Sequence, residues 1–207
     1  MDTQGKLNPQ QLDTLGEIGN ITMGNSATTL SMMVNKRVDI TTPQIQVVPR
    51  AKAMEGFEKT CIFVNIKYVK GITGNNVFIL RPIDVLVLTD LMMGGAGQPQ
   101  AGPLSELHIS AASEAMNQMM GASATSMSTM LKLPVDISTP NVSQVDVDSV
   151  IAFEQAFEAK YQEFVRINFH MEIEGVLASS MIQMYPLQFA VAMCNQFNRV
   201  KGPAGPA

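Results

Sequence analysis

A glutamate and an asparagine three residues apart occur twice in the chain, as Glu17 with Asn20 and as Glu114 with Asn117. Within a helix, three residues span about one turn, so each pair would share a face. Neither residue type is a strong nucleophile, and no His or Cys recurs at matched spacing. An amide both donates and accepts hydrogen bonds, so it can hold a water in line with a reactive phosphoryl group. The carboxylate one turn earlier can pair with a partner's lysine. These pairs suit a substrate that is already activated and carries its own metal ion.

The two pairs belong to an internal duplication with a constant offset of 97 residues. A fixed offset without gaps indicates two copies of one structural unit. Exposed positions normally drift after a duplication, so an acid and an amide retained in both copies indicate a function rather than a plain solvated helix face. The positions aligned by the offset include Glu17 and Glu114, Asn20 and Asn117, Gly24 and Gly121, and Thr42-Pro43 and Thr139-Pro140.

Each copy has the same expected order of elements: a long helix, short extended segments and a second helix. Pro is favoured at the first position of a helix, where its missing N–H would have no partner anyway. The long helices are expected at 9–34 and 105–131, and the second helices at 82–93 and 186–197. β-Branched and aromatic residues favour strands, which are expected at 38–41, 44–48, 61–69, 76–80, 135–137, 143–147, 161–171 and 174–182.

We therefore expect one domain, 1–207, built from two halves at 8–93 and 104–198. The Gly/Pro-rich stretch 94–103 is predicted to be the linker between them. Residues 199–207 are also rich in Gly and Pro, and they are expected to begin a C-terminal linker to a further domain.

Helical periodicity predicts that each long helix has a polar stripe opposite a wide apolar face. Small residues after each stripe, at 24–29 and 121–126, would permit a close approach of the two helices. The first stripe is formed by Asp13, Glu17, Asn20 and Gly24, opposite Leu12, Leu15, Ile18, Leu30 and Met33. The second stripe is formed by Ser110, Glu114, Asn117 and Gly121, opposite Ile109, Met116, Met119, Met127 and Met130.

Composition excludes several classes of protein. The chain has 207 residues, 46% of them hydrophobic, which is enough for one domain with a substantial core. A net charge of −4 without a basic cluster argues against binding to nucleic acid or to an anionic membrane. Only two cysteines are present, so a disulfide scaffold is excluded and a reducing cytoplasm is favoured. No apolar stretch approaches the length of a membrane span.

The motif Asp13-x3-Glu17-x2-Asn20-x22-Pro43 and its copy Ser110-x3-Glu114-x2-Asn117-x22-Pro140 resemble the signature of the CheC/CheX/FliY phosphatases. These proteins dephosphorylate the chemotaxis response regulator CheY. The resemblance covers nearly the whole chain and includes two complete motifs. Its second copy, at 113–121, looks more like the CheC-like domain of FliY, a flagellar switch protein, than like stand-alone CheC.

The resemblance implies an α/β fold, an α+β sandwich with pseudo-twofold symmetry in which two long site-bearing helices pack on antiparallel strands. It also implies that Glu17 and Glu114 contact the regulator, whereas Asn20 and Asn117 position water. The protein would need no cofactor of its own, since Mg²⁺ is expected in the CheY receiver. Implied partners are phosphorylated CheY and the switch proteins FliM, FliG and FliN-like domains. The implied location is the cytoplasmic face of the flagellar basal body.

Two alternatives stay open at this point: a non-catalytic scaffold like the switch protein FliM, which lacks the motif, and a stand-alone CheC-type regulator. Both motif prolines are interpreted as structural, fixing a bend between strands. Other chemical patterns are weaker. The dehalogenase-like run at 146–150 lacks the required buried strand, Cys194 with Arg199 has the wrong spacing for a phosphatase loop, and His170 beside Glu172 is a poor metal site.

Overall fold

The computed structural model describes residues 7–146 and 150–202, except for the side chains at 42–43 and 150–152. The first half forms α1 (Pro9–Val34), β1 (Val38–Pro49), η1 (Arg50–Lys52), β2 (Thr60–Lys70), β3 (Ile72–Leu80) and α2 (Pro82–Met92). The second half forms α3 (Glu106–Leu131), β4 (Asp136–Ile137), β5 (Asn141–Asp146), α4 (Val150–Ala156), β6 (Glu163–Ile173), β7 (Leu177–Pro186) and α5 (Leu187–Lys201).

The strands form one seven-stranded antiparallel sheet in which the two halves are interleaved. Its order is β1-β6-β7-β3-β2-β4, and β5 also pairs with β2. The first strand of each half therefore pairs with a strand of the other half. Strand β1 pairs with β6, and β4 pairs with β2. Exchanging β1 with β4–β5, β2 with β6 and β3 with β7 reverses the order. A pseudo-twofold axis thus passes between β3 and β7, as the resemblance implies.

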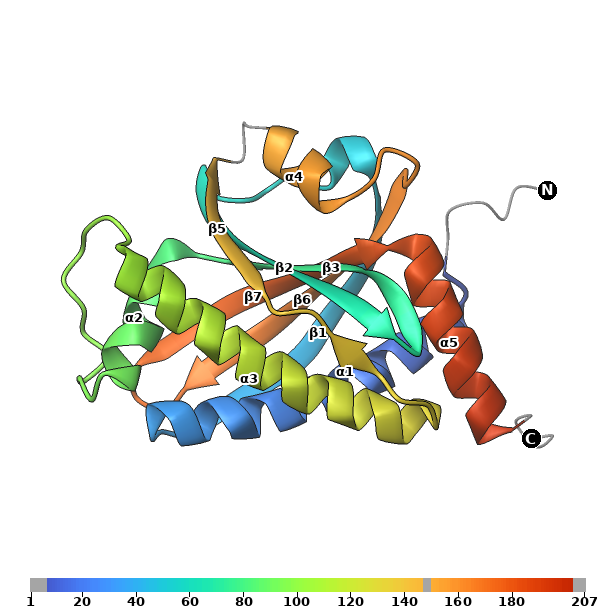
Figure 1. Ribbon diagram of the computed structural model, residues 1–207, viewed down its shortest axis with the longest axis horizontal. Helices are drawn as coiled ribbons and strands as arrows, with labels where there is room; N and C mark the ends of the chain where they lie inside the picture. The colour runs from blue at the N-terminus through green and yellow to red at the C-terminus, as the bar shows by residue number, and fades with distance from the viewer. Residues whose placement is uncertain (1–6, 147–149, 203–207) are drawn as a thin grey trace.

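The four longer helices cover one face of the sheet, with α1 and α3 side by side across its middle (Figure 1). The main core fills the space between these helices and the strands. Side chains alternate along β2, so that Ile62 and Val64 face this core while Cys61 and Phe63 face the other side. The predicted combination of two long helices and an antiparallel sheet is confirmed.

The duplication extends to matched contacts at the ends of the long helices. Ser31 in α1 accepts a hydrogen bond from the backbone N–H of Val38 at 2.9 Å, and Ser128 in α3 accepts the same bond from Val135 at 2.9 Å. Each helix is then followed by a residue in the left-handed conformation, Asn35 with φ 51° and Lys132 with φ 53°. Each serine thus fixes the turn that leads from its helix into the sheet.

The opposite face of the sheet is covered by α4 and η1 (Figure 1). Phe153, Phe157 and Phe164 pack there with ring centroids 4.8 to 5.1 Å apart. The Arg50 guanidinium donates to three backbone carbonyls after α4, at Phe157, Glu158 and Tyr161. Neither helix was predicted. Each is short, and α4 is held by contacts with a distant strand, so neither produces a clear periodic pattern in the sequence.

Several predicted boundaries differ from the structure. The two strands expected at 38–41 and 44–48 are one strand, β1, because a register shift between Thr41 and Gln44 absorbs the interruption. Residues 174–176 form a turn with Gly175 at φ 72°, and β7 begins only at Leu177. Residues 199–201, expected in a linker, continue α5. The rest of that expected linker, 203–207, lies outside the described residues.

The stretch 94–103 contains no helix or strand, as expected of a connection between halves. It is nevertheless anchored to α2. The Asp90 carboxylate accepts hydrogen bonds from the backbone N–H groups of Gly97 at 2.7 Å and of Gln98 at 3.2 Å. Gly97 is buried at φ 78°, and a Cβ there would collide with Val176. This connection is therefore packed against both halves rather than loose.

Candidate functional site

All four predicted site residues lie on the exposed stripes of the two long helices. Glu17 and Asn20 are exposed on α1, and Glu114 and Asn117 are exposed on α3. The opposite faces are buried in the main core, as the periodicity predicted. Buried residues on these faces are Leu15, Ile18, Met23 and Leu30 in α1, and Met116, Met119, Met127 and Leu131 in α3.

Helix caps begin both of the helices that carry the stripes. Asn8 accepts a hydrogen bond from the backbone of Gln11, whose side chain accepts one from the backbone of Asn8, at 2.8 and 2.9 Å. In α3, His108 Nδ1 accepts from the backbone N–H of Ser105 at 2.9 Å. Such caps satisfy backbone groups that have no partner inside the helix.

The two helices run antiparallel and meet near their middle (Figure 1). Ser26 is fully buried, and its hydroxyl donates to the carbonyl of Met119 at 2.8 Å. Near the surface, the Asn25 amide donates to Ser126 Oγ at 2.6 Å. Small residues thus permit the close approach that the sequence predicted. Asn20 and Asn117 each lie on the N-terminal side of this contact, so they flank it on opposite sides.

Gly24 and Gly121 contribute to the site differently from the prediction. A Cβ placed on either glycine would have no heavy atom within 4 Å. The close approach of the helices therefore depends on Ser26 and its neighbours, not on the glycines. Instead, each glycine leaves open surface one helical turn after the asparagine of its stripe. That space would let a docking partner approach the helix backbone.

The two glutamates have different surroundings. Both carboxylate oxygens of Glu17 lie close to Lys201 Nζ, at 2.6 and 2.7 Å. Glu114 accepts a hydrogen bond from the neutral amide of Gln118, one turn later on its own helix, at 2.8 Å. Sequence analysis identified the glutamates but missed the Lys201 contact. No local pattern could have revealed it, since the partners are 184 positions apart.

The motif prolines lie at strand positions. Pro140 is buried directly before β5, and its carbonyl is 3.5 Å from the hydroxyl of Ser113. Pro43 lies within β1 at the register shift, and its side chain is outside the described residues. A proline is tolerated at such an irregularity because it lacks the N–H that a regular ladder requires.

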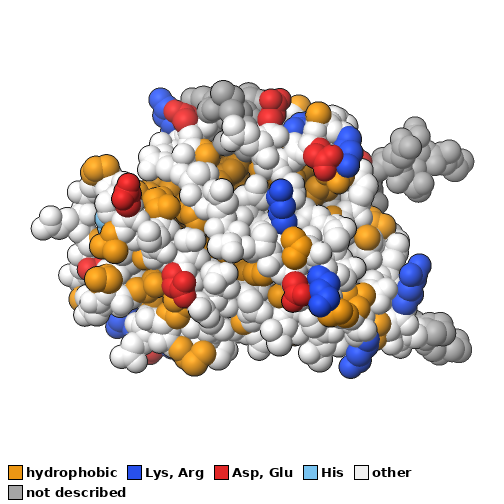
Figure 2. Space-filling view, viewed as in Figure 1, with side chains coloured by type: hydrophobic (Ala, Val, Ile, Leu, Met, Phe, Trp, Pro, Cys, Tyr) orange, Lys and Arg blue, Asp and Glu red, His pale blue; other side chains and the backbone are white. Residues whose placement is uncertain are grey.

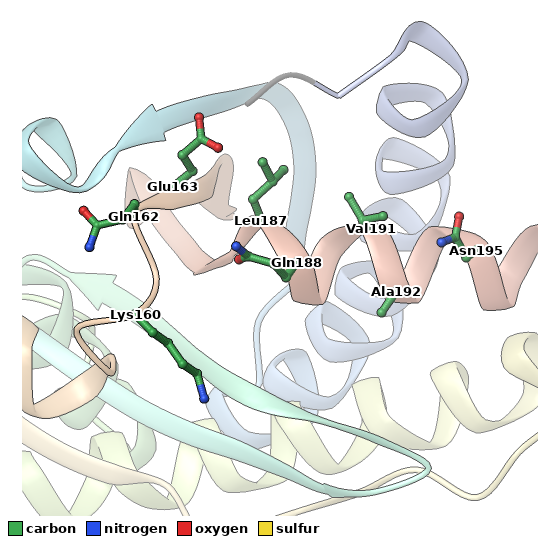
Figure 3. A pocket seen from close by; sticks show the side chains of 8 residues that line it. All are labelled: Lys160, Gln162, Glu163, Leu187, Gln188, Val191, Ala192 and Asn195. Carbon is green, nitrogen blue, oxygen red and sulfur yellow. The ribbon is translucent and has the colours of Figure 1, made fainter. Parts of the chain in front are cut away.

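A groove lies elsewhere, beside the first half of α5 (Figure 3). It has a volume of about 570 Å³, and Leu187, Val191 and Ala192 form its apolar part. A neighbouring groove of about 410 Å³ shares Gln188 and Ala192 with it. None of the four predicted site residues lines either groove. The exposed stripes lie outside both grooves, and an open helix face suits a macromolecular partner better than a small ligand.

Other reactive side chains in the described part of the chain offer no rival site. Cys61 and Cys194 are buried, and burial raises the pKa of each thiol to about 11, so both stay protonated at neutral pH. Among the described residues, no three His, Cys, Asp or Glu side chains gather closely enough to hold a metal ion. Charged side chains are scattered over the face seen in Figure 2 rather than collected in one patch. The described helices include none that is long and apolar enough to cross a membrane.

Comparison with known proteins shows the family to which the chain belongs. The CheC-like family matches residues 11–47 and 107–143, which are the two long helices and the strands that follow them. The chain is 40% identical over 184 residues to the flagellar motor switch phosphatase FliY of Bacillus subtilis (strain 168). That match covers 89% of this chain and 48% of the relative, so the chain spans about half the relative's length.

Solved structures agree with this placement. The crystal structure of Thermotoga maritima FliY superposes with a TM-score of 0.88 at 36% identity, covering 93% of this chain and 98% of that one. The FliM middle domain of H. pylori has a TM-score of 0.70 at 13% identity, covering 92% and 99%, which shows a shared fold only. The chain therefore belongs to the CheC-like family, with FliY among its relatives.

Proposed function

We propose that this protein is a phosphatase that hydrolyses the aspartyl phosphate of the response regulator CheY at the flagellar motor switch. The observation that carries the proposal is the pair of exposed Glu-x2-Asn stripes on two antiparallel helices, related by the pseudo-twofold axis. The B. subtilis relative, which is named a flagellar motor switch phosphatase, supports the same activity.

Hydrolysis would proceed by in-line attack of water on the phosphoryl group. In this proposal the Asn20 or Asn117 amide accepts a hydrogen bond from the water and donates one toward the phosphoryl oxygens. Holding the water in line makes the reaction effectively unimolecular, which can contribute a large part of the rate gain. Both amides are exposed on the long helices, so a receiver domain could bring its phosphoryl group within reach.

Glu17 and Glu114 would fix the orientation of the receiver by pairing with one of its lysines. Each carboxylate is on the same stripe as its asparagine and about one turn away. The receiver would supply the phosphorylated aspartate and the Mg²⁺ that neutralises the transferred phosphoryl group. The complete reactive centre would then exist only in the complex, and the protein itself would need no cofactor.

The proposed setting is the cytoplasmic face of the flagellar basal body, with FliM, FliG and FliN-like domains as neighbours. The likeness to FliM concerns the fold alone. A non-catalytic scaffold would share that fold without requiring the two Glu/Asn pairs.

The test measures the lifetime of phosphorylated CheY with and without the protein. Wild-type protein should shorten the lifetime at substoichiometric concentration. The double variant Asn20→Ala with Asn117→Ala should abolish this effect while binding phosphorylated CheY with nearly unchanged affinity, because the amides act on water and not on docking. The variant Asn195→Ala, which removes an exposed amide from α5, serves as the matched control and should keep full activity. Full activity in the double variant would exclude the water-positioning role.

A further inference from the structure

The Glu17 carboxylate already has a cationic partner within its own chain. Lys201 Nζ lies 2.6 and 2.7 Å from the two carboxylate oxygens. The same ammonium lies 4.7 Å from the centroid of the Phe197 ring, one turn earlier in α5. Both side chains of the ion pair stay partly accessible, with 43% of Glu17 and 53% of Lys201 exposed. An approaching partner can therefore reach this pair without unfolding any element.

Helix packing places Lys201 at this position. Helices α1 and α5 run side by side, and contacts between them recur about one turn apart on both helices, as expected for parallel helices in register. The contact of Lys201 is therefore the third in a regular series of contacts between the two helices. The three contacts are Cys194 Sγ with the carbonyl of Gln11 at 3.6 Å, Thr14 Oγ1 with Asn198 Oδ1 at 3.4 Å, and Lys201 with Glu17.

The second site has no equivalent of Lys201. The counterpart of α5 in the first half is α2, which has 11 residues where α5 has 15, and no basic residue lies in its last turn. Among the described residues, Glu114 is in no ion pair, and its hydrogen bond comes from the neutral Gln118 amide. The extra turn of α5 thus breaks the pseudo-twofold symmetry at one of the two glutamates.

We propose that Lys201 restrains the first site by occupying Glu17 until a partner displaces it. This inference rests on the proposed function, in which Glu17 pairs with a lysine of the receiver. Lys201 presents the same ammonium group to the same two oxygens, so the two lysines compete for one carboxylate. Two ammonium groups held on one carboxylate would also repel each other. The free protein therefore has one open site, at Glu114, and one self-occupied site, at Glu17.

The restraint is small because the ion pair is exposed. Pairs of this kind contribute up to about 1 kcal/mol, which corresponds to a roughly two- to fivefold change in affinity. Removing Lys201 should therefore raise the affinity of the first site for phosphorylated CheY by about two- to fivefold and leave the second site unchanged. The restraint biases the protein toward its second site but does not close the first.

The test measures each site separately. Asn117→Ala leaves only the first site catalytic, and Asn20→Ala leaves only the second. Lys201→Met, which removes the ammonium and keeps the stem over Phe197, is added to each background. We expect it to lower the KM of the first site about two- to fivefold at unchanged kcat and to leave the second site unaltered. Arg199→Met, an exposed cation in the same turn, is the matched control and should change neither site.

An unchanged KM in the Asn117→Ala background, or equal changes in both backgrounds, would overturn the proposal while leaving the phosphatase function intact. If Lys201→Met lowers the melting temperature, Lys201→Gln replaces it and the same comparison decides. Failure of the proposed function is a separate result, because the double asparagine variant would then dephosphorylate CheY as fast as the wild type.

Discussion

At the scale of single residues, Asn20 and Asn117 have equivalent positions, whereas Glu17 and Glu114 do not. Both asparagines are exposed one turn before a glycine that leaves open surface. Glu17 faces Lys201, whereas Glu114 faces a neutral amide. The same two residue types, present in both stripes, would therefore give two sites of the same proposed chemistry and different readiness to bind.

Reversing the charge of both glutamates should weaken docking. In the variant Glu17→Lys with Glu114→Lys, an ammonium would face the receiver's lysine at each site, and at the first site it would also repel Lys201. We expect the affinity for phosphorylated CheY to fall roughly three- to tenfold at low salt, where charge interactions are least screened. Titration by fluorescence measures it. Glu154→Lys, on the opposite face of the sheet, is the control, and unchanged affinity in the double variant would assign the carboxylates another role.

At the scale of elements, each long helix is held by a serine near its end. Ser31 and Ser128 are partly buried, and each accepts one backbone hydrogen bond, from Val38 at the start of β1 and from Val135 directly before β4. Each bond ties the last turns of its helix to the chain that enters the sheet.

Replacing either serine by alanine should destabilise the protein by a similar amount. Ser31→Ala and Ser128→Ala each leave a backbone N–H without its partner, which costs about 1 kcal/mol. Denaturant unfolding followed by circular dichroism measures the free energy of unfolding. The exposed Ser180→Ala is the control and should have little effect. A large effect of one serine and none of the other would show that the two turns are not equivalent.

At the scale of the whole molecule, the two halves form one folding unit. Strand β1 pairs with β6 of the other half, β5 pairs with β2, and the main core spans both halves. The duplication is thus visible as symmetry but not as two separable domains.

Neither half should fold alone. The fragments 8–93 and 104–198, expressed separately, would each lose the strand partner of their first strand and leave much of the shared core exposed. We expect circular dichroism to show little fixed structure in each and a single cooperative transition in the intact protein. Mixing the two fragments should restore helical signal. A cooperative unfolding transition in either isolated fragment would contradict this view.

Because the two sites are separate, each single asparagine variant should keep substantial activity. Distant sites contribute nearly independently, so neither Asn20→Ala nor Asn117→Ala should abolish dephosphorylation. The loss should be greater for Asn117→Ala, since the second site lacks the Lys201 restraint. Initial rates at subsaturating phosphorylated CheY measure the difference. Complete loss of turnover in one folded single variant would mean that the other copy of the motif is vestigial.

The sequence by itself determined the local features of this protein. The constant offset predicted two copies of one structural unit, and helical periodicity predicted which faces of α1 and α3 are buried. Both long helices were predicted to within one residue, because a proline or a cap begins each and the apolar period continues to its end. The four candidate residues lie on the exposed faces as predicted, while their chemical roles remain predictions.

Only the tertiary structure decided how these parts meet. The exchange of strands between halves, the antiparallel contact at Ser26, and the short helix α4 all depend on residues far apart in the chain. The pairing of Glu17 with Lys201 joins positions 184 apart and requires α5 to continue one turn beyond its predicted end. Periodicity and spacing describe neighbours along one element, whereas these contacts arise from packing between elements, which no local pattern encodes.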